Sequence, residues 1–132
     1  MISALRIVQT RHGWLSKEHI SDIAHYLGMP EIAVMEVATF YNMFNLEPKG
    51  KYQITVCTNI SCMLRNSDEI VQHLEKKLGI SFGEVSKDKK FSLKEGECMG
   101  ACGSAPLCLI NNHTMHEYLT TEKIDQLLAS LK

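Results

Sequence analysis

Two stretches of sequence organise this chain: residues 56–63 read VCTNISCM, and residues 96–106 read GECMGACGSAP. Each stretch holds one pair of cysteines: Cys57 and Cys62 in the first, Cys98 and Cys102 in the second. The spacings are C-x4-C and C-x3-C, and each pair follows a segment with the composition of a β-strand. Four thiolates supplied as two pairs by separate loops suit a soft metal centre. The pattern therefore predicts a domain built around such a centre.

The identity of the centre is open from spacing alone. A [2Fe–2S] cluster takes four ligands, usually all thiolate and two on each iron, so each cysteine pair would clamp one iron. Gly100 and Gly103 would let backbone N–H groups approach the sulfurs closely. Structural zinc is an alternative, although most four-cysteine zinc sites use tighter C-x2-C pairs. Free or redox-active thiols are a third possibility.

The fifth cysteine, Cys108, lies between Leu107 and Leu109 in a short apolar run. We expect it to be a buried core residue and no ligand, because free cysteine behaves as a small hydrophobic side chain. Residues 1–10 lack the basic head, apolar run and cleavage site of a signal peptide. A reducing cytosol is therefore expected, where paired cysteines favour metal or redox chemistry over structural disulfides.

Composition excludes several classes of protein. The 132 residues carry a net charge of −1, which argues against a bulk nucleic-acid or acidic-membrane binder. The longest uncharged stretch, residues 98–116, contains Pro106 and several polar residues, so we expect no membrane insertion. No phosphate-binding glycine motif or nucleophile elbow is present, so the polypeptide alone cannot be a complete oxidoreductase.

The pattern of elements divides the chain in two. Apolar spacing predicts three helices up to about residue 44, with Ser16 as an N-cap and Gly28 as a stop. Residues 45–50 read NLEPKG, which is typical of a linker. The expected domains are therefore a helical docking segment, 1–48, and a domain that holds the centre, 49–132.

The second part has the pattern β-α-β-β-β-α, which indicates a small layered α/β sheet. Strands are expected at 51–56, 91–94, 107–110 and 113–119, with a hairpin turn at Asn111-Asn112. A helix is expected from a capping box of Asn66 and Glu69 to Gly79, and a last helix is expected after Thr120.

Residues 21–40 offer a competing interpretation, because they have the pattern of a DNA-binding helix-turn-helix. A redox-responsive regulator would then be possible. The would-be recognition helix, 31–40, carries two acidic residues and no lysine or arginine. Because phosphate contacts dominate affinity for DNA, this helix is better suited to a protein partner.

Four segments together resemble the thioredoxin-like [2Fe–2S] ferredoxin subunit, the NuoE family, of NADH:quinone oxidoreductase, respiratory complex I. They read GWLS at 13–16, VATFYNMF at 37–44, VCTNISCMLR at 56–65 and ECMGACGSAP at 97–106. The resemblance covers essentially the whole chain. Related subunits serve NAD-linked formate dehydrogenases and hydrogenases, but residues 57–65 are most similar to the complex I branch.

The resemblance implies an α+β protein: an N-terminal helical segment followed by a thioredoxin-like β-α-β-β-β-α ferredoxin domain. The ligands of the [2Fe–2S] cluster would be Cys57 and Cys62 on one iron, and Cys98 and Cys102 on the other. The partner would be the FMN- and NADH-binding flavoprotein subunit, and single electrons would pass between cluster and flavin. The assembly would face the cytoplasm at the inner membrane.

Two departures from the family accompany the resemblance. Family members usually carry a further N-terminal stretch ahead of the equivalent of residues 3–5, so the helical bundle is expected to be incomplete. They also tend to have proline where Thr121 stands. Thr120 can still cap the last helix, so we expect little effect from this difference.

Overall fold

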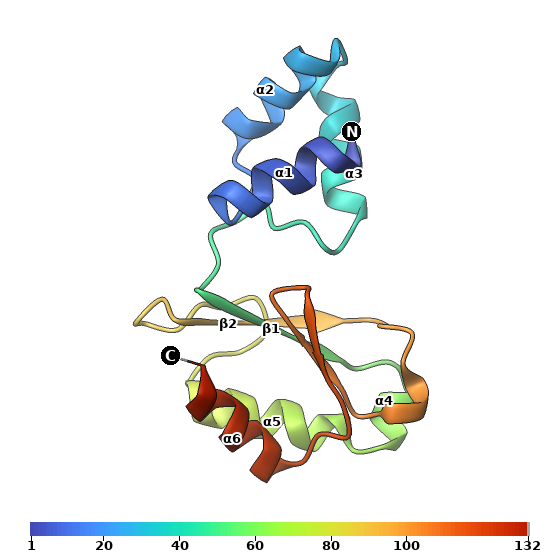
Figure 1. Ribbon diagram of the computed structural model, residues 1–132, viewed down its shortest axis with the longest axis vertical. Helices are drawn as coiled ribbons and strands as arrows, with labels where there is room; N and C mark the ends of the chain where they lie inside the picture. The colour runs from blue at the N-terminus through green and yellow to red at the C-terminus, as the bar shows by residue number, and fades with distance from the viewer. Residues whose placement is uncertain (132) are drawn as a thin grey trace. The chain divides into compact units, whose positions relative to one another are not determined.

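The computed structural model describes residues 1–131; Lys132, the last residue of the predicted second domain, lies outside the described residues. The chain forms two compact units, one from Met1 to Lys49 and one that begins at Gly50. The first unit consists of helices, and the second contains a four-stranded sheet with helices packed on it (Figure 1). The expected α+β class, with helices preceding the sheet, is confirmed.

Three helices make up the first unit: α1 (Ile2–His12), α2 (Lys17–Leu27) and α3 (Glu31–Phe40). The first two end at Gly13 and Gly28, whose φ angles of 83° and 62° lie in the left-handed region that glycine adopts without a steric penalty. The helices enclose a small apolar core that consists of Leu5, Leu15, Ile20, Ile23, Ala24, Val34, Ala38 and Phe44.

Local hydrogen bonds fix the start of α2 and the end of the unit. The Ser16 hydroxyl accepts the His19 N–H at 3.2 Å, and the His19 ring accepts the Ser16 N–H at 3.2 Å, so the predicted cap is present as a reciprocal pair. The Gln9 side chain donates to the Met43 carbonyl at 2.8 Å and accepts the Asn45 N–H at 2.7 Å. These bonds attach the segment after α3 to α1.

The sheet of the second unit has the strand order β2-β1-β3-β4. Its strands are β1 (Tyr52–Cys57), β2 (Phe91–Gly96), β3 (Cys108–Ile110) and β4 (Thr114–His116). The pair β1–β2 is parallel, and the other two pairs are antiparallel. A parallel pair requires a crossover, and the helix α5 (Ser67–Leu78) supplies it.

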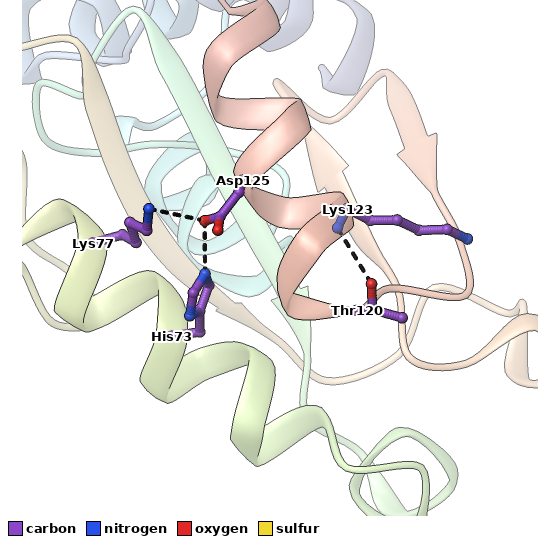
Figure 2. Close-up of polar contacts among 5 residues, drawn as sticks. All are labelled: His73, Lys77, Thr120, Lys123 and Asp125. Carbon is purple, nitrogen blue, oxygen red and sulfur yellow. Dashed lines mark hydrogen bonds and ion pairs between the residues drawn. The ribbon is translucent and has the colours of Figure 1, made fainter.

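Helices α5 and α6 (Thr121–Ser130) lie side by side against one face of the sheet (Figure 1). Ile54 and Val56 of β1 and Leu74 of α5 are completely buried there, as is Ile124 of α6. Each such side chain contributes about 1.5–3 kcal/mol when removed from water. At the start of α6 the Thr120 hydroxyl accepts the Lys123 N–H at 3.3 Å, so the predicted cap is confirmed (Figure 2).

Three details differ from the expectation. Asn66 does precede α5, but it has a φ of 64° and its side chain caps no N–H group of the helix, so the predicted capping box with Glu69 is wrong. A short helix, α4 (Ile60–Leu64), was not predicted. The return strand spans Thr114–His116 and not 113–119, while Asn111 and Asn112 form the expected turn with φ angles of 54° and 56°.

Candidate metal centre

The parallel pairing of β1 and β2 brings the two cysteine loops to the same edge of the sheet. Cys57, the last residue of β1, is in register with Gly96, the last residue of β2. Parallel strands run in the same direction, so the segments that follow them emerge next to each other. Cys62 therefore follows one strand and Cys98 the neighbouring strand at a common edge, and the expectation that each cysteine pair follows a strand is confirmed.

The first loop folds back so that both of its cysteines are buried. Cys57 is 3% exposed and Cys62 is 1% exposed. Between them the Asn59 side chain accepts the Ile60 N–H at 2.7 Å and caps α4, which carries Cys62. These two cysteines pack with Ala105 and Leu107 in a small cluster distinct from the main core.

The second loop keeps its cysteines at the surface. Cys98 and Cys102 are exposed, and Cys102 opens a short 3-10 helix, η1 (Cys102–Ser104). Gly100 has a φ of 70°, and its N–H donates to the Cys98 sulfur at 3.4 Å. Hydrogen bonds from backbone N–H groups to ligand sulfurs help to set the potential of iron–sulfur centres, so the expected role of Gly100 has a structural counterpart.

Electrostatic contacts link three of the four cysteines. Burial raises the pKa of the Cys62 thiol to about 11, and a hydrogen bond with Cys57 and the charges of Cys57 and Cys102 act in the same direction. The Cys57 thiol also donates to the Glu97 carbonyl at 3.9 Å, directly before Cys98. The first cysteine pair is therefore in contact, and the second loop lies beside it.

Within residues 1–131, no three cysteine, histidine or carboxylate side chains converge closely enough to hold one metal ion. A [2Fe–2S] cluster distributes its ligands differently, with two thiolates on each of two irons. The chemistry of the donor set, four thiols in two adjacent loops, fits this group. The assignment of Cys57, Cys62, Cys98 and Cys102 as its ligands stays a prediction.

Cys108 belongs to the core and not to the cysteine loops. It lies in β3 opposite Val56, is completely buried, and packs in the main apolar cluster. Burial raises the pKa of its thiol to about 12. A thiol this difficult to deprotonate is a poor ligand and nucleophile, in agreement with the expectation from its apolar neighbours.

Two hydroxyl–carboxylate bonds that support the loops were not predicted. The Thr58 hydroxyl donates to the Glu95 carboxylate at 2.7 Å, and the Ser104 hydroxyl donates to the Glu117 carboxylate at 2.7 Å. Thr58 and Glu95 are 37 positions apart. The sequence signal for this pair is that Thr58 and Glu95 each lie just after a predicted strand. This signal predicts a contact only once the parallel register of the two strands is known.

At Gly96 the side chains of Met99 and Thr55 pack so close to the backbone that there is no room for a Cβ atom. A Cβ atom at this position would lie 2.7 Å from the Met99 Cε and 2.9 Å from the Thr55 Cγ2. Both distances are well inside van der Waals contact. A side chain at position 96 would therefore displace Met99, which packs against the small cluster of Cys57, Cys62, Ala105 and Leu107.

The fold and the cysteine loops together define a small ferredoxin-type domain, which a helical segment precedes in the sequence. The family model for the thioredoxin-like [2Fe-2S] ferredoxin matches residues 1–132. The chain belongs to this family, and its cofactor is a [2Fe–2S] cluster. This result favours the iron–sulfur interpretation of the cysteines over zinc and over free thiols.

Three known proteins are similar to this chain in sequence or in structure. It is 48% identical to the E subunit of NADH-quinone oxidoreductase from Rickettsia conorii over 120 residues, which are 91% of this chain and 71% of the relative. It is 39% identical to NADH-quinone oxidoreductase subunit 2 of Thermus thermophilus over 97% of this chain and 71% of the relative. In structure it is similar to part of an NAD+-reducing [NiFe]-hydrogenase, with a TM-score of 0.82, 21% identity, and coverage of 97% of this chain and 22% of that chain. The last likeness shows the fold alone.

Proposed function

We propose that this chain is the electron-transfer subunit of an NADH:quinone oxidoreductase. In this role it exchanges single electrons with the FMN of an NADH-binding partner subunit. The observation that carries the proposal is the register of Cys57 opposite Gly96, which puts two cysteine loops of the required donor chemistry at one edge of a ferredoxin-type sheet. The two relatives of 48% and 39% identity support the same assignment.

The proposed ligands are Cys57, Cys62, Cys98 and Cys102, held by the unit that begins at Gly50. When bound, a [2Fe–2S] cluster supplies a carrier of one electron at a time. The protein side contributes three things: the first loop excludes water from Cys57 and Cys62, Gly100 donates its N–H to the Cys98 sulfur, and the strand pair holds the two loops together. In this proposal the chemistry of NADH belongs to the partner subunit.

The proposed partner is the FMN- and NADH-binding flavoprotein subunit, and residues 1–48 are proposed as a docking segment. The support is the exposure of large apolar side chains on that segment: Tyr26 is 84%, Phe40 80% and Ile32 65% exposed. The Phe40 ring also packs edge-on against Tyr41, with ring centroids 5.2 Å apart. Exposed aromatic side chains are typical of protein interfaces. The exposed face of α3 carries Glu31 and Glu36 and no basic residue, which argues against DNA as the partner.

A second exposed apolar group lies beside the candidate ligands. In α4, Cys62 is buried while Ile60 and Leu64 are 67% and 75% exposed. We propose that the flavoprotein also covers this helix, because exchange of electrons requires the partner to approach the cysteine loops.

The proposed location is the cytoplasmic side of the inner membrane, as part of the complex. Among residues 1–131, none of the helices has the length and apolar character needed to cross a membrane. An equivalent subunit of an NAD-linked formate dehydrogenase or hydrogenase is the alternative host. The likeness to the hydrogenase has 21% identity, against 48% and 39% for the oxidoreductase subunits, so the first assignment is better supported.

Co-expression with the flavoprotein subunit tests this proposal. We expect the two polypeptides to co-purify with FMN, and NADH to reduce both the flavin and a [2Fe–2S] centre, seen by electron paramagnetic resonance (EPR) at low temperature. A Cys57→Ala variant should still co-purify but should lack that signal. Failure of the wild-type pair to associate, or zinc bound to this chain in place of iron, would refute the proposal.

A further inference from the structure

A hydrogen bond between the side chains of Thr58 and Glu95 connects the segments that hold the two cysteine pairs. The Thr58 Oγ1 donates to the Glu95 Oε1 at 2.7 Å. Thr58 directly follows Cys57, and Glu95 lies three residues before Cys98. The bond therefore joins the first residue after one proposed ligand to the strand end that leads into another.

Two further hydrogen bonds join the same two segments of chain. The Thr58 N–H donates to the Gly96 carbonyl at 3.0 Å, one step beyond the last residue pair of β1 and β2. The Cys57 thiol reaches the Glu97 carbonyl at 3.9 Å. Of these groups the thiol would be lost as a donor once Cys57 bound iron as a thiolate. The Thr58 side chain and N–H would then carry the connection between the loops.

We infer that the Thr58–Glu95 hydrogen bond is a positioning contact that sets the separation of the two cysteine loops and slows release of the cluster. The inference rests on the proposed function, since it takes the four cysteines as ligands. With these ligands each loop would hold one iron, so the separation of the loops would have to suit a cluster of two irons. A contact that limits this distance keeps the second pair of thiolates within reach when one ligand dissociates.

The charge of Glu95 and its hydrogen bond are separable in experiment. Glu95 is exposed, so the field of its carboxylate at the cluster is reduced by solvent and salt. Thr58→Val removes the donor and keeps the charge. Glu95→Gln removes the charge and keeps an acceptor oxygen, whereas Glu95→Leu removes both. Thr58→Ser keeps the donor and is the matched control.

The test uses the full chain, purified with its cluster under anaerobic conditions. Two quantities are measured: the rate at which a chelator removes iron, and the shape of the EPR spectrum of the reduced protein, scaled to equal cluster content. From the usual strength of a hydrogen bond to a charged group, we expect Thr58→Val and Glu95→Leu to release iron roughly threefold to tenfold faster than the wild type. Both variants should change the EPR spectrum in the same way as each other. Thr58→Ser should match the wild type, and Glu95→Gln should lie nearer to the wild type than Glu95→Leu. The double variant Thr58→Val/Glu95→Leu should be no worse than either single variant.

Different results refute different statements. A wild-type protein that binds no iron would refute the proposed function and the role of this bond with it. A wild-type protein with a normal cluster, together with a Thr58→Val variant that matches it in both measurements, would refute the positioning contact alone. So would additive effects of Thr58→Val and Glu95→Leu, or an equal effect of Glu95→Gln and Glu95→Leu, because these outcomes indicate independent or purely charge-based roles.

Discussion

His73 of α5 and Asp125 of α6 are joined by a hydrogen bond of 2.8 Å between the His73 Nε2 and the Asp125 Oδ1, which links the two helices (Figure 2). Lys77, one turn further along α5, lies 3.2 Å from the same oxygen. Both contacts connect residues that are about fifty positions apart. They add a polar contact to the apolar packing between α5, α6 and the sheet.

This contact predicts a dependence of stability on acid. The hydrogen bond from His73 holds the pKa of Asp125 below its ordinary value of 3.8, and Lys77 acts in the same direction. A carboxylate with a lowered pKa in the folded state contributes stability that is fully present above the unfolded value and is lost as pH falls through the folded value. The Asp125→Asn variant should therefore unfold at a modestly lower temperature than the wild type at neutral pH. The difference should begin to shrink as pH falls to about 3.8 and should disappear only once the pH is below the lowered pKa of the folded state.

A double-mutant cycle with His73→Gln separates this contact from general effects of substitution. We expect the two substitutions together to cost less than the sum of their separate costs, because each removes the same bond. Asp125 is partly exposed, so the effect on the melting temperature should be small. Equal differences between wild type and Asp125→Asn at neutral and acidic pH would show that the carboxylate contributes no titrating interaction.

Replacing single cysteines by alanine should have two different effects on the cluster. Cys57→Ala and Cys102→Ala should each abolish the native cluster, because each removes one of the four proposed thiolates. Cys108→Ala should retain it, with a loss of about 1 kcal/mol in the free energy of unfolding from the smaller buried side chain. Visible absorption and iron content measure the cluster, and denaturant titration measures the stability. Loss of the cluster in Cys108→Ala would mean that the ligands are misassigned.

Gly96→Ala should cause a packing defect that shorter neighbouring side chains partly relieve. Gly96→Ala forces a methyl group to within 2.7 Å of the Met99 Cε, and overpacking of this kind typically costs about 1–3 kcal/mol. Shortening the neighbour with Met99→Ala should recover part of the stability, and adding Thr55→Ser should recover more. Thermal unfolding of the three variants measures this.

Gly50→Ala is the matched control for that series. A Cβ atom at Gly50 would lie 2.6 Å from the backbone carbonyl carbon of Phe91, so no side-chain substitution can relieve the contact. Gly50→Ala should therefore be destabilised whether or not Met99 is shortened. A Gly96→Ala variant as stable as the wild type would contradict the close approach described at this position.

The exposed side of α4 predicts a defect in assembly alone. Leu64→Glu should weaken co-purification of the flavoprotein, since it puts a charge on a face that we propose is covered, while the absorption of the cluster should remain normal. Lys76→Glu, on the exposed surface of α5, is the control and should assemble normally. Normal assembly of Leu64→Glu would exclude α4 from the interface.

Much of this architecture was predictable, because it follows from local chemistry. Gly28 ends a helix through a left-handed conformation, and Ser16 and Thr120 begin helices by accepting backbone N–H groups. All three positions were predicted from residue type and spacing. The turn at Asn111-Asn112 follows from the tolerance of asparagine for positive φ.

The errors lie where the tertiary environment decides. Asn66 has the residue type of a cap, but it adopts a left-handed conformation between two successive helices and makes no side-chain cap. The helix α4 has five residues, which is too short for an apolar period to appear in the sequence. The Thr58–Glu95 bond depends on the register between two strands, which a single sequence does not reveal.

The most direct measurement is the iron and sulfide content of the full chain purified without oxygen, together with EPR of the dithionite-reduced protein. The account predicts about two irons and two sulfides per polypeptide and the EPR signal of a [2Fe–2S] cluster that has taken up one electron. One zinc ion per polypeptide with no visible absorption, or iron that is retained when Cys57 and Cys62 are both replaced by alanine, would contradict it.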